Sequence, residues 1–178
     1  MKDTIVHRLR HSSKAHASAR EAKGASAIRT ALEGMAAGAL GVAAMTLAEK
    51  VEQLFTKRPN SYVPAHTLER LLGLPRKADH ERLVLNHVMH WGQGILLGTV
   101  RAFMARAGMQ GAIPSFMFTA LRLSNDQLLE NATGVGAPPW TWPKDEQWVD
   151  LIHKTVYGFA TGFVADRLYP DRVRRHDQ

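Results

Sequence analysis

The sequence predicts an all-α fold, a helical membrane bundle of about four helices that pack through GxxxG pairs. Polar residues recur at helical spacing within the apolar stretches, and no stretch alternates as a strand does. Glycine destabilises a helix in water but lets membrane helices approach closely, so glycines four residues apart predict helix contacts. The predicted packing glycines are Gly34, Gly38, Gly41, Gly94, Gly98, Gly158 and Gly162.

Composition leaves both a soluble protein and a small membrane protein open. The 178 residues suffice for one domain with a core, 45% of them are hydrophobic, and the mean hydropathy is -0.22. Cysteine is absent, which excludes disulfides, thiolate metal sites and cysteine nucleophiles. The formal net charge of +7 favours an anionic partner.

Charge divides the chain into three segments. Residues 1–29 form a basic arm that we expect to be disordered, residues 30–168 a helical membrane domain, and residues 169–178 a basic tail. The partner expected for the arm is the lipid bilayer, and no specific nucleic acid is expected. The Arg, Ser and Ala content of the arm is also typical of a mitochondrial targeting peptide, and this alternative stays open.

The first predicted helix covers residues 31–48, in which Glu33 is the only charged residue. Its length is about 27 Å at about 1.5 Å per residue, just enough to cross the hydrocarbon core of a bilayer. A helical wheel places its glycines with Ala37, Ala44 and Ala48 on one half, and its leucines with Ala43 on the other. The small half favours close packing.

A polar connector follows the first helix. Pro59 and Pro64 predict a loop, and Thr67 is the expected N-cap of a short amphipathic helix over residues 68–72 that Gly73 ends. This pattern favours a bent segment at or outside the membrane interface. The alternative interpretation is an ordinary surface connector.

The second long helix is predicted over residues 80–107, with Asp79 as its N-cap. One stripe of this helix is polar or small, whereas apolar side chains cover the opposite face. The stripe contains His87, His90, Gly94, Gly98 and Arg101. A polar inside with an apolar outside is the pattern expected when the outside is lipid.

The third long helix is predicted to begin at Pro114 and to run to about residue 132, before Gly134. Arg122, Asp126 and Glu130 share one face of it because they are four residues apart. These side chains either face the interior of the bundle, or the helix leaves the bilayer near Arg122. Whether the segment spans stays open.

A proline-rich connector precedes the last helix. Trp140, Trp142 and Trp148 lie beside prolines and before an apolar run, which is typical of interfacial anchors. The last helix is predicted over residues 145–168, with Asp150, His153 and Tyr157 on one stripe. Basic residues outside the first and last helices predict a multi-pass protein with both termini on the cytoplasmic or matrix side.

Ionisable residues within membrane helices usually face a cavity or a partner, so they are the candidates for a ligand site or an ion pathway. The candidates are Glu33, His87, His90, Arg122, Asp126, Glu130, Asp150, His153 and Tyr157. Histidines three residues apart are too common to predict a metal, and no glycine-rich phosphate loop or hydrolase motif occurs. We therefore expect neither a metal nor a cofactor.

Five motifs carry a resemblance to a known group. They are a GxxxGxxG run that leads to Met45, Thr46 and Glu49, an RPxSYVP loop, HWGxGxxxG from His90, PPWTWP from Pro138, and HKxVYGxxTG from His153. Over residues 30–168 the chain resembles a loose family of small multi-pass membrane proteins of unknown function. The resemblance implies a helical membrane fold and no activity or catalytic residue.

The function expected from the sequence is that of an integral membrane protein, either a small transport or permeation element or a membrane scaffold. An enzymatic role is less favoured. Two alternatives stay open: a soluble or peripheral helical bundle that binds a metal or haem, and a membrane-associated enzyme that acts on an apolar substrate with His90 or His153 as acid or base. An oligomer of identical chains also stays open, as do the ligand and the host membrane.

Overall fold

Every long element of the described chain is a helix, as predicted. The computed structural model describes the backbone of residues 2–170 and the side chains of residues 22–170. The elements are α1 (Lys2–Thr56), α2 (Val63–Leu72), the 3-10 helix η1 (Asp79–Glu81), α3 (Leu83–Arg106), α4 (Ala112–Ala132), the 3-10 helix η2 (Pro139–Thr141) and α5 (Lys144–Arg167). The all-α prediction is confirmed.

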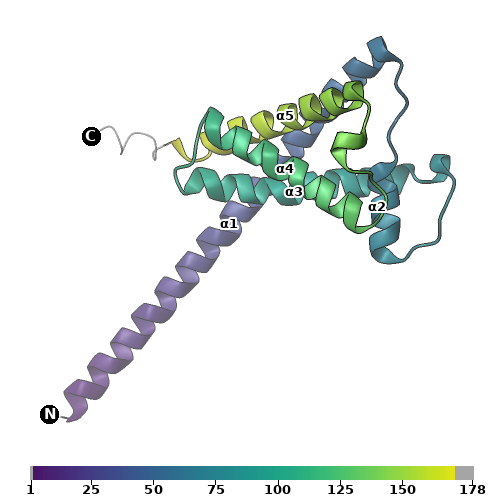
Figure 1. The fold of residues 1–178 in the computed structure, drawn as a ribbon. Helices are drawn as coiled ribbons and strands as arrows, with labels where there is room; N and C mark the ends of the chain where they lie inside the picture. The colour runs from purple at the N-terminus through teal and green to yellow at the C-terminus, as the bar shows by residue number, and fades with distance from the viewer. Residues whose placement is uncertain (1, 171–178) are drawn as a thin grey trace.

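The four long helices α1, α3, α4 and α5 form the bundle, as Figure 1 shows. α1 packs against α3 and α5, α4 packs against α5, and α2 covers α3. The Tyr169 hydroxyl donates a hydrogen bond of 2.6 Å to Glu33, and Arg106 donates one of 2.7 Å to the Thr30 hydroxyl. The bundle part of α1 therefore starts at the end of the bundle where α5 finishes, opposite the end that carries α2.

The structure corrects three predicted boundaries. α1 is longer than residues 31–48 and begins at Lys2, so its helical backbone includes the arm expected to be disordered. Its first proline comes only at Pro59, so nothing breaks the helix earlier. Thr67 lies inside α2, which has Pro64 in its first turn, and is not an N-cap. Most of the predicted basic tail, residues 171–178, lies outside the described residues.

The third correction concerns Asp79. Its carboxylate pairs with Arg82 and does not cap a long helix, because residues 79–81 form η1 and α3 begins only at Leu83. The predicted end of α2 is confirmed, because Gly73 ends it with a left-handed φ of 63°. α4 begins at Ala112, two residues before the predicted start at Pro114, which lies in its first turn.

The backbones of α1 and α3 touch at their glycine pairs. A Cβ on Gly34 would lie 2.6 Å from the Cα of Thr99 and 2.7 Å from the carbonyl oxygen of Gly98. A Cβ on Gly38 would lie 3.1 Å from the Cα of Gly98. Because these neighbours are backbone atoms, they cannot rotate away. The backbones of α1 and α3 therefore lie in direct contact at these glycines.

The glycines of α5 serve a different contact. Gly158 lies against the hydroxyl of Thr119, and Gly162 against the hydroxyl of Ser115. Both hydroxyls belong to α4 and are buried. The nearest neighbours of the last glycine pair are therefore small polar side chains of α4, whereas those of Gly34 and Gly38 are backbone atoms.

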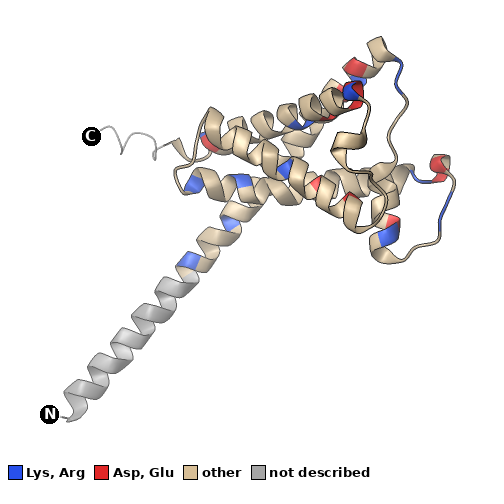
Figure 2. Cartoon of the chain, viewed as in Figure 1, with Lys and Arg blue, Asp and Glu red and all other residues tan. Residues whose placement is uncertain are grey.

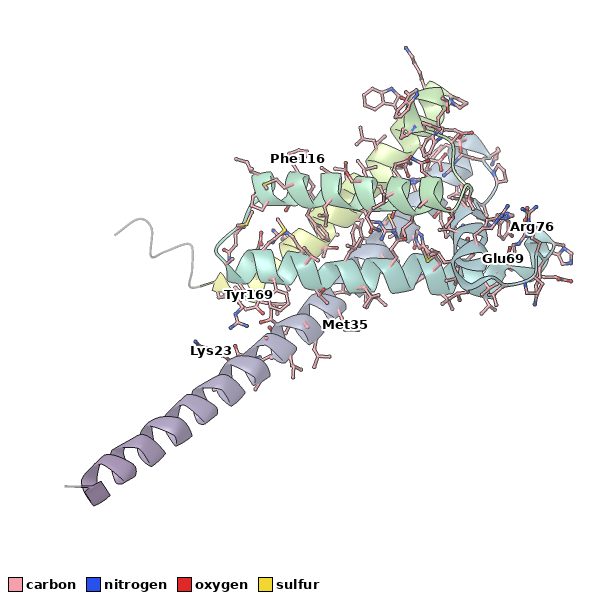
Figure 3. All side chains as sticks on the ribbon, turned by 60° about the horizontal axis from the view of Figure 1, so that its bottom comes forward. Lys23, Met35, Glu69, Arg76, Phe116 and Tyr169 are labelled. Atoms are coloured by element: carbon pink, nitrogen blue, oxygen red, sulfur yellow. The ribbon has the colours of Figure 1, made fainter. Side chains whose placement is uncertain are left out.

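Polar side chains fill much of the interior, whereas large apolar side chains cover the exterior. Arg101 and Arg122 are 0% and 2% exposed, and small residues such as Ala37 and Thr161 are fully buried. Exposed apolar residues occur on all four long helices, and Figure 3 shows Phe116 at the outer side of α4. They include Leu32, Leu40, Leu47, Val84, Val88, Leu96, Phe103, Ile113, Phe116, Met117, Ile152 and Phe163.

Arg101 joins three segments at the end of the bundle away from α2. Its Nη2 donates a hydrogen bond of 2.6 Å to Asp166 on α5, and its Nη1 donates one of 3.3 Å to the carbonyl oxygen of Met109. The backbone N–H of Gly111 donates a hydrogen bond of 2.9 Å to the same carboxylate. The pair Arg101 and Asp166 therefore fixes the turn between α3 and α4 onto α5.

A buried ion pair fixes α2 to the start of α3. Arg82 Nε donates a hydrogen bond of 2.9 Å to Glu69 Oε1, and the two side chains are 6% and 3% exposed. Asp79 and His66 also contact the guanidinium group. The Arg82 guanidinium holds the pKa of the Glu69 carboxyl below its usual range.

This ion pair predicts an acid-dependent release of α2. Because the pKa of Glu69 is lowered in the folded protein, the stabilisation is fully present above the usual pKa of glutamate. It is lost as the pH falls through the lowered value. We expect α2 amides to exchange faster at acid pH, after correction for intrinsic rates, in wild type but not in Glu69→Gln. An equal acid response in the variant would contradict this assignment.

Candidate functional site

A cavity of about 360 Å³ lies at the α2 end of the bundle. Its walls come from α1, α3, α4 and α5, from the start of α2, and from the connectors that flank α2 and α5. Figure 2 shows acidic and basic residues at this end of the molecule, in and near α2 and near the end of α1, and further charged residues along the other helices. Its volume is at the lower end of the range of small-molecule sites.

Seven of the nine candidate residues from the sequence line this cavity. They are His87, His90, Arg122, Asp126, Glu130, Asp150 and His153. The remaining two candidates lie elsewhere. Glu33 is at the opposite end of the bundle, where it binds Arg29 and Tyr169. Tyr157 is fully buried, and its hydroxyl donates a hydrogen bond of 2.6 Å to the carbonyl oxygen of Gly94.

Asp126 is the centre of the charge network in the cavity. Its Oδ2 lies 3.0 Å from Lys154 Nζ and 3.1 Å from Arg122 Nε, and its Oδ1 accepts a hydrogen bond of 2.6 Å from Gln93. Lys154 also donates a hydrogen bond of 2.8 Å to Asp150. The network thus joins α3, α4 and α5 and balances two cations with two carboxylates.

Arg122 keeps unused hydrogen-bonding capacity. Its Nη1 is buried without a hydrogen-bond partner in the described part of the chain. The Nε is close to Asp126 but also makes no hydrogen bond there. The guanidinium lies 5.2 Å from the centre of the Tyr157 ring. His90 Nε2 on α3 likewise has no partner among the described residues, and it donates or accepts according to the tautomer of the ring. Buried polar atoms without partners favour a hydrogen-bonding group from a ligand or water.

The outer part of the cavity is rich in carboxylates. Glu49 lies near the end of α1, Glu130 near the end of α4, and Glu146 in the first turn of α5. None of the three forms an ion pair with another residue in the described range. The cationic Lys50 and Arg58 line the same region, but Lys50 bonds amide side chains and Arg58 pairs with Glu52.

The inner end of the cavity meets an apolar cluster. Val42, Met45, Phe118 and Tyr157 form this cluster, and all four side chains are buried. The rings of Phe118 and Tyr157 are 5.6 Å apart. Beyond the cluster lie the close glycine contacts of α1 and α3. In the described structure the cavity therefore opens toward the α2 end and ends at the core.

The predicted tryptophan anchors differ in position. Trp140 and Trp148 are 80% and 63% exposed, as an interfacial anchor requires. Trp142 instead lines the cavity, and its indole N–H donates a hydrogen bond of 2.8 Å to the carbonyl oxygen of Ala137. Trp142 therefore belongs to the cavity wall.

The polar cavity residues that sequence reasoning missed as candidates include Glu49, Gln93, Glu146 and Lys154. A signal existed for Lys154, because it follows Asp150 by four residues and such pairs contact each other on a helix. Gln93 had no such signal, since its partner Asp126 lies on another helix. Among the described residues, no group of three or more His, Asp or Glu side chains could hold a metal ion.

Comparison of the chain with known protein families, characterised proteins and solved structures finds no match. The resemblance to a family of small multi-pass membrane proteins therefore stays a prediction. By length and hydropathy, one described helical segment is able to cross a membrane, Ala22–Thr56 within α1.

Proposed function

We propose that the chain is an integral membrane protein that binds a small polar ligand in the cavity at the α2 end. In this proposal α1, α3, α4 and α5 span the bilayer, and α2 and the tryptophan connector lie at one interface. The observation that carries the proposal is the inverted distribution of polarity between the interior and the exterior. The cavity adds the second part, a site for a ligand.

The inverted polarity favours lipid as the surrounding medium. In water, burying an arginine while exposing leucines is unfavourable on both counts. Here Arg122 is 2% exposed, whereas Leu40 and Leu96 are 57% and 62% exposed. In a bilayer the same arrangement places apolar side chains against lipid and ionisable groups against each other.

Helix lengths also support four spans. α3, α4 and α5 contain 24, 21 and 24 residues, which correspond to about 32 to 36 Å. A hydrocarbon core is about 30 Å thick. The polar residues of these helices lower their mean hydropathy, and by length and hydropathy only the segment in α1 is selected among the described residues. Several of these residues, such as Arg101, Arg122 and Asp126, are buried.

The cavity favours ligand binding over a purely structural role. A scaffold needs no polar space between its helices, because such space costs packing contacts and desolvates charged groups. An open pore is less favoured, since Phe118 and Tyr157 close the inner end. In this proposal the cavity is a binding site open to one side of the membrane, as expected of a transport element in one of its states.

The proposal includes the topology expected from the sequence. With four spans, the two ends of the chain share one side of the membrane, and the contact between Glu33 and Tyr169 supports this arrangement. The positive-inside rule favours the cytoplasmic or matrix side for both termini. The cavity would then open to the opposite side.

Extraction of membranes tests the proposal. We expect the full chain to stay in the pellet after an alkaline carbonate wash and to be released by detergent, because spanning helices are held by lipid and not by surface charge. Reporters fused to the two termini should give the same orientation. Full recovery in the carbonate supernatant would contradict the spanning proposal and favour the soluble or peripheral bundle.

A further inference from the structure

The cavity carries opposite electrical character at its two ends, and this polarity indicates a class of ligand. The inner end has buried nitrogen atoms without partners among the described residues, including Nη1 of Arg122, which is a donor, and Nε2 of His90, which is a donor in one of the two neutral tautomers. The outer end has carboxylates without ion pairs among the described residues, on Glu49, Glu130 and Glu146. The order follows from the helices: Arg122 lies two helical turns deeper along α4 than Glu130.

The inner network is already charge-balanced. Arg122 and Lys154 are matched by Asp126 and Asp150. A free anion would therefore add net negative charge to a half-buried site that also contains the outer carboxylates, which is unfavourable at low dielectric. A free cation would leave the unused donors of Arg122 without an acceptor. A ligand with an anionic group inside and a cationic group outside satisfies both ends.

We propose that the cavity binds a small zwitterion of the α-amino acid type, with its carboxylate at Arg122 and His90 and its ammonium group toward Glu130 and Glu146. This inference rests on the proposed function, since it names the ligand class of the same cavity. The volume of about 360 Å³ suits a small molecule. Trp142 and Trp91 line the same cavity and supply apolar surface for the rest of the ligand.

Arg122 is suited to the carboxylate because its planar group binds carboxylates with two parallel N–H donors. Tyr157 lies against the guanidinium and holds its position from the side of the core. The anionic partner Asp126 takes only the Nε side of the arginine, at 3.1 Å. The Nη1 atom is therefore the donor that is left for a hydrogen bond to a ligand carboxylate.

Binding to the purified protein in detergent tests the inference. Each standard L-amino acid is titrated by calorimetry and screened for a rise in the midpoint of thermal unfolding. We expect at least one to bind, and we expect its N-acetyl derivative and its methyl ester to bind about 10- to 100-fold more weakly, as each lacks one charge. Binding by no amino acid would overturn the inference, as would equal binding of the N-acetyl derivative.

Variants of the cavity residues test which of them bind the carboxylate and which bind the ammonium group of the ligand. Arg122→Gln should weaken binding about 10- to 100-fold, and so should Glu130→Gln combined with Glu146→Gln. Glu33→Gln is the matched control, because Glu33 lies at the other end of the bundle and should leave binding unchanged. If Arg122→Gln does not fold, the glutamate variants decide: unchanged affinity in them overturns the proposed orientation and ligand class.

A lipid head group has related chemistry, so one arm of the experiment uses glycerophosphoethanolamine, which is a zwitterion without acyl chains. Binding of this probe without binding of any amino acid would overturn the inference in favour of a lipid head group. The carbonate extraction of the unliganded protein is independent of all these outcomes. A failure of ligand binding is therefore distinguishable from a failure of the membrane proposal.

Discussion

Leu96→Arg is expected to prevent stable insertion of the protein, although Leu96 is 62% exposed in the bundle. Leu96 lies near the middle of α3, where the proposal places the centre of the bilayer. An arginine there costs about 2.5 to 3.5 kcal/mol on the insertion scale, and the favourable contribution of leucine is lost as well. In a soluble bundle the same surface substitution would change stability by only about 0.5 kcal/mol.

Leu72→Arg is the matched control for this variant. Leu72 is also 62% exposed, but it ends α2, which the proposal places outside the hydrocarbon. The measurement is the carbonate-resistant fraction and the yield of folded protein in detergent for each variant. We expect a large loss for Leu96→Arg and wild-type behaviour for Leu72→Arg. Wild-type behaviour of both variants would contradict a lipid-facing α3.

The long helices were predictable because local signals mark them. Pro114, Gly73 and Gly134 lie at or beside helix ends. The glycines of each pair are four residues apart, a spacing that places both on one face of a helix. The errors concern caps. Thr67 and Asp79 are good N-caps by residue type, but Asp79 binds Arg82, and Pro64 starts α2 one turn earlier. These choices depend on tertiary contacts.

Candidate site residues were predictable where they share a helical stripe. His90, Arg122 and His153 were found because each follows the polar stripe of its helix, and all three reach the cavity. Glu33 follows the same logic on α1 but lies at the other end of the bundle. A stripe fixes the face of a helix but not the depth at which a residue lies. The depth of a residue within the bundle depends on where α1 and α3 cross, and the sequence of one helix alone does not determine this point.

Gly98→Ala is expected to destabilise the protein, whereas Gly92→Ala on the same helix is expected to stabilise it. Alanine is favoured over glycine within a helix by roughly 0.5 to 1 kcal/mol. At Gly92 the added Cβ has no atom within 4 Å outside its own helix backbone, so this gain is retained. At Gly98 the Cβ would lie 2.6 Å from the Cα and 2.7 Å from the nitrogen of Gly38.

Backbone atoms of α1 can avoid this added carbon only if the whole helix moves, so the overpacking cost of about 1 to 3 kcal/mol should exceed the gain in helix propensity. Gly158→Ala should cost less, because its Cβ would lie closest to the Thr119 hydroxyl, which can rotate, and its nearest backbone neighbour, the carbonyl oxygen of Ser115, would lie 3.3 Å away. Unfolding in detergent, followed for all three variants, gives the order. Equal stability of Gly98→Ala and Gly92→Ala would contradict the direct contact of α1 with α3.

A destabilised Gly98→Ala should also lose affinity for any cavity ligand. Glu49 lines the cavity from α1 and His90 lines it from α3, and the crossing of these two helices sets the distance between the two residues.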